Sequence, residues 1–328
     1  MNSNPLVSVM ISTHNRADYL RESVASVLSQ TFTDFELILC DDASTDETPA
    51  VCQELERLDD RVRVFRHEHN LGMVGNWNSG LEASCGQYFG KLDDDNKYLP
   101  TFLEKTIQAL EATPKASLAF VDEWFIDDHG KRDVALTEKM SRHYGRNLLK
   151  AGLQSDMALL AVQQAIGING TLLVREAVKK VGGFRPSADS GADMDLFLRL
   201  AQCGHYIYFI SERLAEYRTH EGMSTADLLS NQQKAQATVA IWETYSFRGI
   251  AEYLRREKLV RAYITLCRVM LLKHDVAAAR IALRNAVKLA PSKPGPFLLM
   301  LCLSLPESLI QQALHFRYGK KLNRVAPQ

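Results

Sequence analysis

The sequence shows neither a charge imbalance nor a paired-cysteine motif. Lys and Arg total 39, as do Asp and Glu, so no overall positive field favours a nucleic-acid partner. The six cysteines include no Cys-x-x-Cys pair, and we interpret them as packed, reduced thiols rather than disulfides or zinc ligands. These absences predict a cytoplasmic protein that binds no nucleic acid.

Long apolar segments are also missing from the 328 residues. No run approaches the roughly 20 apolar residues that a membrane-spanning helix needs. The first residues carry no basic and apolar segments of the kind found in secretory signals, so we expect no signal. A hydrophobic content of 46% is that of an ordinary globular protein with ample core.

Strand and helix patterns alternate from residue 7 onward. Apolar runs predict strands at Val7–Ser12 and Phe35–Cys40, and helical spacing of apolar residues predicts a helix over residues 18–30. Ser44 to Glu47 fits a capping box that opens a second helix. This order favours an α/β fold with a mostly parallel, doubly wound sheet. Neither a Gly-x-Gly-x-x-Gly motif nor a Walker loop follows the first strand, which argues against dehydrogenases and P-loop enzymes.

Polar groups stand at three predicted strand ends: Ser12 to Asn15, Asp41-Asp42, and Asp93 to Asp95. Since such ends meet in a crevice of α/β sheets, we expect the three segments to converge. The three adjacent carboxylates repel one another unless a cation joins them, and Mg²⁺ or Mn²⁺ would bring phosphate with it. Taken alone, the triplet is more typical of a solvated acidic turn, but its position at the carboxyl end of a predicted strand favours a ligand site.

Four segments in order resemble the family 2 glycosyltransferases, which are inverting enzymes of the GT-A fold that use nucleotide-sugar donors. They are residues 7–16, 29–32, 36–46 and 92–96, and the resemblance covers roughly residues 6–225. It implies a catalytic domain over 1–225, with nucleotide-sugar binding at about 6–100 and the acceptor side at about 115–225. Residues 226–328 would be a helical C-terminal region.

The resemblance implies a role for each polar strand end. Ser12, His14 and Asn15 would line the nucleotide site, and Asp42 would accept from the base N3–H. Asn76 would lie near the donor sugar, as would Asp122 and Glu123, although solvation at the sheet edge explains the last two equally well.

The same resemblance implies a divalent cation, Mg²⁺ or Mn²⁺. Asp95 would be the metal ligand, and either Asp94 or Asp93 would contact the ribose. His220 would complete the metal site or donate to a phosphate, and Arg218 could add positive charge there.

Asp193 matches the catalytic base of the family. Relatives usually carry Glu-Asp at this point, whereas this chain has Ala192-Asp193. Asp195 is the fallback base. Without the family, Asp193 is a carboxylate interacting with a helix N-terminus.

The last hundred residues change character, with scarce glycine and long helical patterns. An apolar run at 297–303 precedes the basic residues Arg317, Lys320, Lys321 and Arg324. This combination fits either peripheral contact with the inner face of the plasma membrane or a helix packed on the catalytic domain.

We therefore expect an inverting glycosyltransferase. It would move a hexosyl or N-acetylhexosaminyl group from a nucleotide-diphosphate sugar, with UDP as the first expectation. The acceptor would be a glycan or lipid-linked hydroxyl in polysaccharide or glycolipid biosynthesis. Two alternatives stay open: a non-catalytic GT-A partner subunit that binds nucleotide, and a sugar nucleotidyltransferase.

Overall fold

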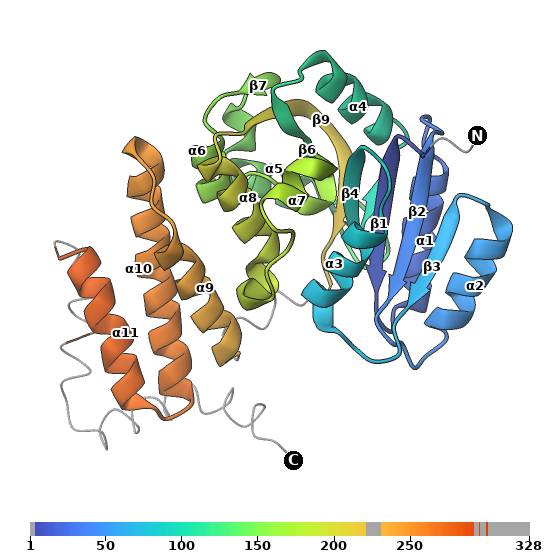
Figure 1. Ribbon diagram of the computed structural model, residues 1–328. Coiled ribbons are helices and arrows are strands. Elements are labelled where there is room, and N and C mark those ends of the chain that lie inside the picture. The colour runs from blue at the N-terminus through green and yellow to red at the C-terminus, as the bar shows by residue number, and fades with distance from the viewer. Residues whose placement is uncertain (1–3, 221–230, 292–294, 296–299, 301–328) are drawn as a thin grey trace. The chain divides into compact units, whose positions relative to one another are not determined.

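The computed structural model describes residues 4–220, 231–291, 295 and 300. The chain divides into two compact units, Met1–Glu221 and Gly222–Gln328 (Figure 1). The domain boundary expected after residue 225 lies outside the described residues.

The first unit is built on a nine-stranded sheet in the order β3-β2-β1-β4-β8-β6-β9-β5, with β7 paired to β9. Its N-terminal half is parallel throughout, as the alternation of strands and helices predicts. The strands of this half are β1 (Val7–Thr13), β2 (Phe35–Asp41), β3 (Val62–Arg66) and β4 (Tyr88–Asp93).

The other half of the sheet mixes directions. β8 runs antiparallel to β4 and to β6, whereas β6 and β9 are parallel. Two short strands, β5 and β7, pair antiparallel with β9. The bounds are β5 (Lys97–Tyr98), β6 (Ala116–Ile126), β7 (Gly152–Gln154), β8 (Thr171–Val174) and β9 (Tyr206–Arg218).

Helices cover both faces of the parallel half (Figure 1). Val7, Val9 and Ile11 of β1 share one core with apolar residues of α1, α2 and α4. Residues that alternate with these face α3, where Gly80 lies against Met10. The helices of this unit are α1 (Ala17–Leu28), α2 (Thr48–Leu58), α3 (Gly72–Ala83), α4 (Phe102–Ala112), α5 (Val134–His143), α6 (Met157–Gln163), α7 (Arg175–Lys180) and α8 (Ala192–Gln202).

One local prediction is wrong. The expected capping box at Ser44 to Glu47 does not open α2, which begins at Thr48 and has no side-chain cap. The Ser44 hydroxyl instead accepts a hydrogen bond from the backbone N–H of Asn15, at 2.9 Å. A residue suited to capping is therefore used to join two loops at the carboxyl edge of the sheet.

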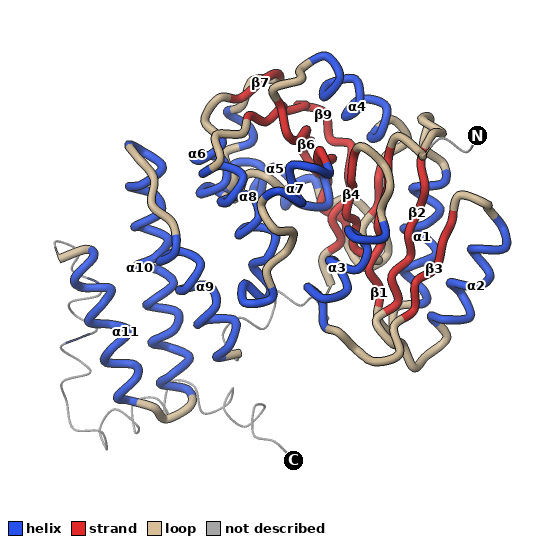
Figure 2. Tube along the Cα trace, viewed as in Figure 1, coloured by secondary structure: helices blue, strands red, loops and turns tan. Residues whose placement is uncertain are grey.

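All described secondary structure of the second unit is helical (Figure 2). It comprises α9 (Gln232–Thr244), α10 (Gly249–Leu272) and α11 (Val276–Leu289). Within the described part of the chain, no helix is both long and apolar enough to traverse a bilayer. The apolar run at 297–303 and the basic residues from 317 onward lie outside the described residues.

Candidate active site

Three polar strand ends meet at one edge of the sheet, as expected. Ser12 pairs in register with Cys40 on one side and with Asp93 on the other. The backbone N–H of Asp42 donates to the Thr13 carbonyl, at 3.0 Å. The loops that follow β1, β2 and β4 therefore leave the sheet side by side.

The first two of these loops are tied together by short polar contacts. Asn15 takes a left-handed conformation (φ 54°), and its side-chain oxygen accepts from the Thr45 N–H, at 2.8 Å. His14 Nδ1 lies 2.8 Å from the carbonyl oxygen of Asp42. The Asp42 carboxylate accepts from the Leu71 N–H, at 2.6 Å, which adds the loop before α3 to the same cluster.

Ser12 and Asn76 are both engaged within the protein. Trp77 Nε1 donates to the Ser12 hydroxyl, at 3.2 Å. Asn76 is buried, its amide N–H donates to the Cys40 carbonyl, and its oxygen lies 3.1 Å from His67 Nε2. Asn76 thus fixes α3 against β2, and its contact with a donor stays a prediction.

The three carboxylates at 93–95 have different surroundings. Asp93 forms an ion pair with Lys91 and accepts from Asn169 Nδ2, at 2.8 Å. Asp94 is 8% exposed, and burial together with neighbouring Asp95 raises its pKa to about 7. Burial, and then Asp93, also raise the pKa of Asp95. Lys91 therefore compensates the charge of Asp93, whereas the surroundings of Asp94 and Asp95 disfavour two neighbouring negative charges.

His220 lies beside Asp95 although 125 residues separate them. Its Nε2 is 3.1 Å from Asp95 Oδ2. Arg16 also reaches this point, with its guanidinium 3.2 Å from His220 Nε2 and 3.9 Å from the Asp95 carboxylate. The two residues expected to form the metal site are therefore adjacent.

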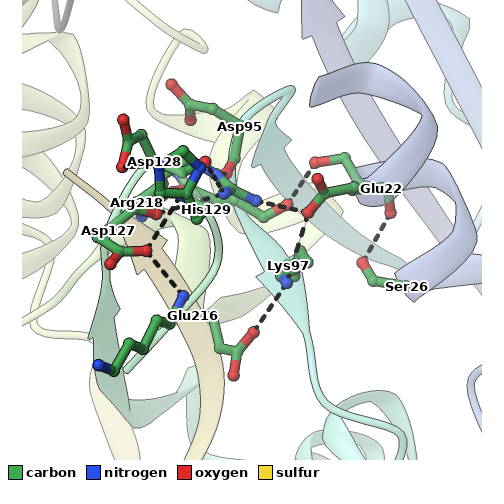
Figure 3. A network of polar contacts seen from close by, with 12 residues as sticks. Glu22, Ser26, Asp95, Lys97, Asp127, Asp128, His129, Glu216 and Arg218 are labelled. Atoms are coloured by element: carbon green, nitrogen blue, oxygen red, sulfur yellow. Dashed lines mark hydrogen bonds and ion pairs between the residues drawn. The ribbon is translucent and has the colours of Figure 1, made fainter. Parts of the chain in front are cut away.

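Arg218 does not have the role expected for it. It is fully buried and donates to the carbonyl oxygen of Asp95, at 2.9 Å, and of Asp128, at 2.8 Å (Figure 3). Its remaining nitrogen donates to the Glu22 carboxylate, at 2.7 Å. Arg218 therefore holds the Asp95 loop in place. Its positive charge is paired with Glu22, and its other donors bind backbone carbonyls.

The donor set at Asp95 fits a divalent cation that also binds substrate. Among the residues that the structure describes, no three His, Cys, Asp or Glu side chains gather into a complete protein metal site. Mg²⁺ in particular is usually held by one or two carboxylates plus water and substrate phosphates. The buried Asp94 carboxylate and the partly buried Asp95 carboxylate, with an imidazole beside Asp95, suit such a partial ligand set.

Asp193 is the second residue of α8 and is partly buried. One carboxylate oxygen accepts from the Met194 N–H, at 2.7 Å. Burial raises its pKa most strongly, while the nearby charge of Lys91 lowers it and that of Asp93 raises it. Asp193 is thus within electrostatic reach of the acidic triplet. Asp195, the fallback base, is buried in an ion pair with Arg199, at 2.8 Å.

Sequence reasoning missed a buried cation that pairs with two acids of β6. Arg146 is 4% exposed and lies 2.6 Å from the Glu123 carboxylate and 3.5 Å from that of Asp122. Both acids are buried, so solvation at the sheet edge does not explain them. The cation lies about twenty residues away in a segment without a recognisable motif, so no local pattern could have revealed the pairing.

Comparison with known proteins places this site in a family. Residues 8–158 match the family described as Glycosyl transferase family 2. A putative teichuronic acid biosynthesis glycosyltransferase, TuaG of Bacillus subtilis, is 30% identical over 71% of this chain and 85% of its own length. An uncharacterized glycosyltransferase of Haemophilus influenzae is 36% identical over 34% of each chain.

Solved structures show the same fold. Staphylococcus aureus TarS, in complex with UDP-GlcNAc, superposes with a TM-score of 0.65 at 15% identity, covering 97% of this chain and 89% of the other. The Pyrobaculum calidifontis mannosyltransferase PcManGT, in complex with GDP-Man and Mn²⁺, gives 0.60 at 14% identity, covering 96% and 88%. Together with the polar strand ends described above, these matches show that the chain belongs to glycosyl transferase family 2 and is a glycosyltransferase of the GT-A fold.

Proposed function

We propose that this glycosyltransferase inverts the anomeric configuration and moves a hexosyl or N-acetylhexosaminyl group from a nucleotide-diphosphate sugar, with UDP as the first candidate, to an acceptor hydroxyl. Mg²⁺ or Mn²⁺, held by Asp95 and His220, would assist. The observation that carries the proposal is the meeting of these two residues at the strand edge that also bears Ser12 and Asp42. Two proteins of the same fold support it: the structure of TarS holds UDP-GlcNAc, and that of PcManGT holds GDP-Man and Mn²⁺.

Different residues would bind the diphosphate, the base and the ribose of the donor. When bound, the cation would neutralise charge on the departing diphosphate. Ser12, His14 and Asn15 would line the nucleotide site, Asp42 would accept from the base, and the ribose would be held by Asp93 or Asp94. These contacts fix the anomeric carbon in front of the acceptor, which lowers the entropic part of the barrier.

Asp193 would act as general base. Its carboxylate takes the proton of the acceptor hydroxyl while that oxygen bonds to the anomeric carbon and the bond to the phosphate oxygen breaks. Attack from the face opposite the nucleotide inverts the configuration and needs no covalent enzyme intermediate. Burial makes Asp193 a stronger base than a solvated carboxylate, because it disfavours the charged form.

Nucleotide release from a panel of UDP- and dTDP-sugars, with Mg²⁺ or Mn²⁺, tests the metal assignment. We expect wild type to hydrolyse one of these nucleotide-sugars or to transfer its sugar, and we expect Asp95→Asn to do neither. Asp128→Asn is the matched control, because that side chain is 57% exposed and Arg218 contacts its backbone carbonyl instead. Equal turnover by wild type and Asp95→Asn would remove Asp95 from the metal site.

A non-catalytic, nucleotide-binding subunit is the second candidate. It is favoured by Ala192, which stands where relatives usually carry an acid and is fully buried. The Asp193→Asn variant discussed below separates this candidate from an enzyme. A sugar nucleotidyltransferase would instead release pyrophosphate from UTP and a sugar 1-phosphate, which a separate pyrophosphate assay monitors.

The acceptor would be a glycan or a lipid-linked sugar, in polysaccharide or glycolipid biosynthesis, on the cytoplasmic side of the membrane. The basic residues Arg317, Lys320, Lys321 and Arg324 motivate peripheral contact with anionic lipid. Cosedimentation of the full chain with phosphatidylserine vesicles tests this contact. Binding no stronger than to phosphatidylcholine vesicles would argue against it.

A further inference from the structure

A fully buried lysine lies at the centre of the candidate site. Lys91 is in β4, two residues before Asp93, and its side chain is 0% exposed. Its Nζ forms an ion pair with the Asp93 carboxylate and lies 3.9 Å from the centroid of the Trp77 ring. Trp77 in turn donates to the Ser12 hydroxyl. One ammonium group thus connects the strand end of β4 with α3, whose indole reaches β1.

Stability alone does not explain why the charged Lys91 side chain is buried. Lys91 pairs in register with Met10, on the face of the sheet that α3 covers. A buried ion pair is often no more stabilising than apolar side chains of similar volume, so methionine could serve packing equally well. What methionine could not supply is a fixed positive charge beside Asp93.

Asn169 completes a clamp around Asp93. Its amide N–H donates to the second Asp93 oxygen, at 2.8 Å, and its carbonyl oxygen accepts from the Asp93 backbone N–H, also at 2.8 Å. Asn169 is 5% exposed and is held in the 3₁₀ turn Ile168–Gly170. Both carboxylate oxygens and the backbone of Asp93 are thereby fixed. Each oxygen can still accept a further hydrogen bond, such as one from a ribose hydroxyl.

We propose that Lys91 is a positioning residue for the transfer reaction: with Asn169 it fixes Asp93 in the orientation that meets the donor. This deepens the proposed function and rests on it. It also assigns Asp93 an orienting role apart from cation binding, which is left to Asp95.

Two variants test the clamp from its two sides. Lys91→Met removes the charge and should weaken UDP binding in Mn²⁺ by about tenfold to a hundredfold, as loss of a supporting residue typically does. Asn169→Ala releases Asp93 without changing a charge, and it should also weaken UDP binding.

Lys97→Met is the matched control. Lys97 is 22% exposed and pairs with Glu216, at 3.3 Å, and Glu22, at 3.6 Å, neither of which we place in the site. Replacing a merely structural lysine should lower the melting temperature and leave the UDP affinity unchanged, as we expect for Lys97→Met.

The outcomes are distinct from those that test the function itself. If wild type neither binds UDP with Mn²⁺ nor turns over a UDP-sugar, the proposed function fails in its UDP form. If wild type does both and folded Lys91→Met matches it in UDP affinity, the inference about Lys91 is wrong. Should Lys91→Met not fold, unchanged UDP affinity in Asn169→Ala would overturn the clamp.

Discussion

Asp193 is the residue on which the catalytic proposal rests. The Asp193→Asn side chain can still accept from the Met194 N–H through its amide oxygen, but it cannot take a proton. We expect sugar transfer to fall by about 10²- to 10⁴-fold, the usual contribution of a general base, with UDP affinity unchanged. Initial rates and calorimetric UDP titration of the same preparation provide the measurement.

Asp195→Asn is the control for this variant. Asp195 is bound by Arg199, so its loss should lower stability and leave transfer by the folded protein intact. If Asp193→Asn kept full activity and Asp195→Asn lost it, the base would be Asp195. If both kept full transfer, neither would be the base.

The raised pKa of Asp193 predicts the pH dependence of catalysis. Burial raises the pKa in the folded protein, so the ionised base is lost as pH falls through a value above the usual 3.9 or so of aspartate. The unfolded chain binds fewer protons in this window, so Asp193 lowers stability as pH rises through it. We expect the acid limb of kcat/KM to lie above the range of a solvated aspartate; a limb at or below that range would contradict the assignment.

The positions of some single residues could be predicted from the sequence, and those of others could not. Ser12, Asp42 and the acidic triplet were predicted to converge because the carboxyl ends of parallel strands share one edge, and they do. The role of Lys91 could not be predicted, since its partner Asp93 is fixed by Asn169, which only the antiparallel pairing of β8 brings near. Contacts across an antiparallel junction leave no local pattern.

Among the elements, β9 shows where a hydrophobic pattern misleads. Ser211, Glu212 and Arg213 interrupt the apolar run, so the hydrophobic pattern by itself indicates two strands, at 206–210 and 214–218. The structure has one strand, Tyr206–Arg218, in which Ile210 pairs with Val121 and Arg213 with Asp122. Residues 211 and 212 therefore form a bulge, and the strand continues through it to carry Arg218 to the Asp95 loop.

Arg146 joins the insertion between β6 and β8, residues 127–170, to the sheet. Its guanidinium contacts the Glu123 and Asp122 carboxylates and donates to the Ala165 carbonyl, at 2.7 Å. In Arg146→Met these buried carboxylates lose a partner, so we expect the free energy of unfolding to fall by about 3–5 kcal/mol. Urea denaturation at pH 7 measures the change.

Arg142→Met is the comparison within the same segment. Arg142 is 62% exposed and lies 4.0 Å from Glu138, so its loss should cost under about 1 kcal/mol. Equal destabilisation by the two variants would show that the buried ion cluster does not hold the insertion.

At the scale of the whole molecule, the alternating strand and helix patterns were sufficient to predict the parallel half of the sheet in the first unit. Val7, Val9 and Ile11 face one helical layer while Met10 faces α3, which is the two-sided burial that the continuous apolar runs indicated. The mixed half of the sheet was harder to predict, because β5 and β7 have only two and three residues and show little hydrophobic pattern. In the second unit, helical spacing was enough to predict α10 and α11.

The central claim is that carboxylates at neighbouring strand ends hold a cation that binds a diphosphate. Calorimetric titration of UDP into wild type and Asp95→Asn, each with Mn²⁺ and with EDTA, tests it most directly. We predict UDP binding by wild type in Mn²⁺, with loss of that binding in EDTA and in Asp95→Asn. The same affinity in all four titrations would contradict the claim.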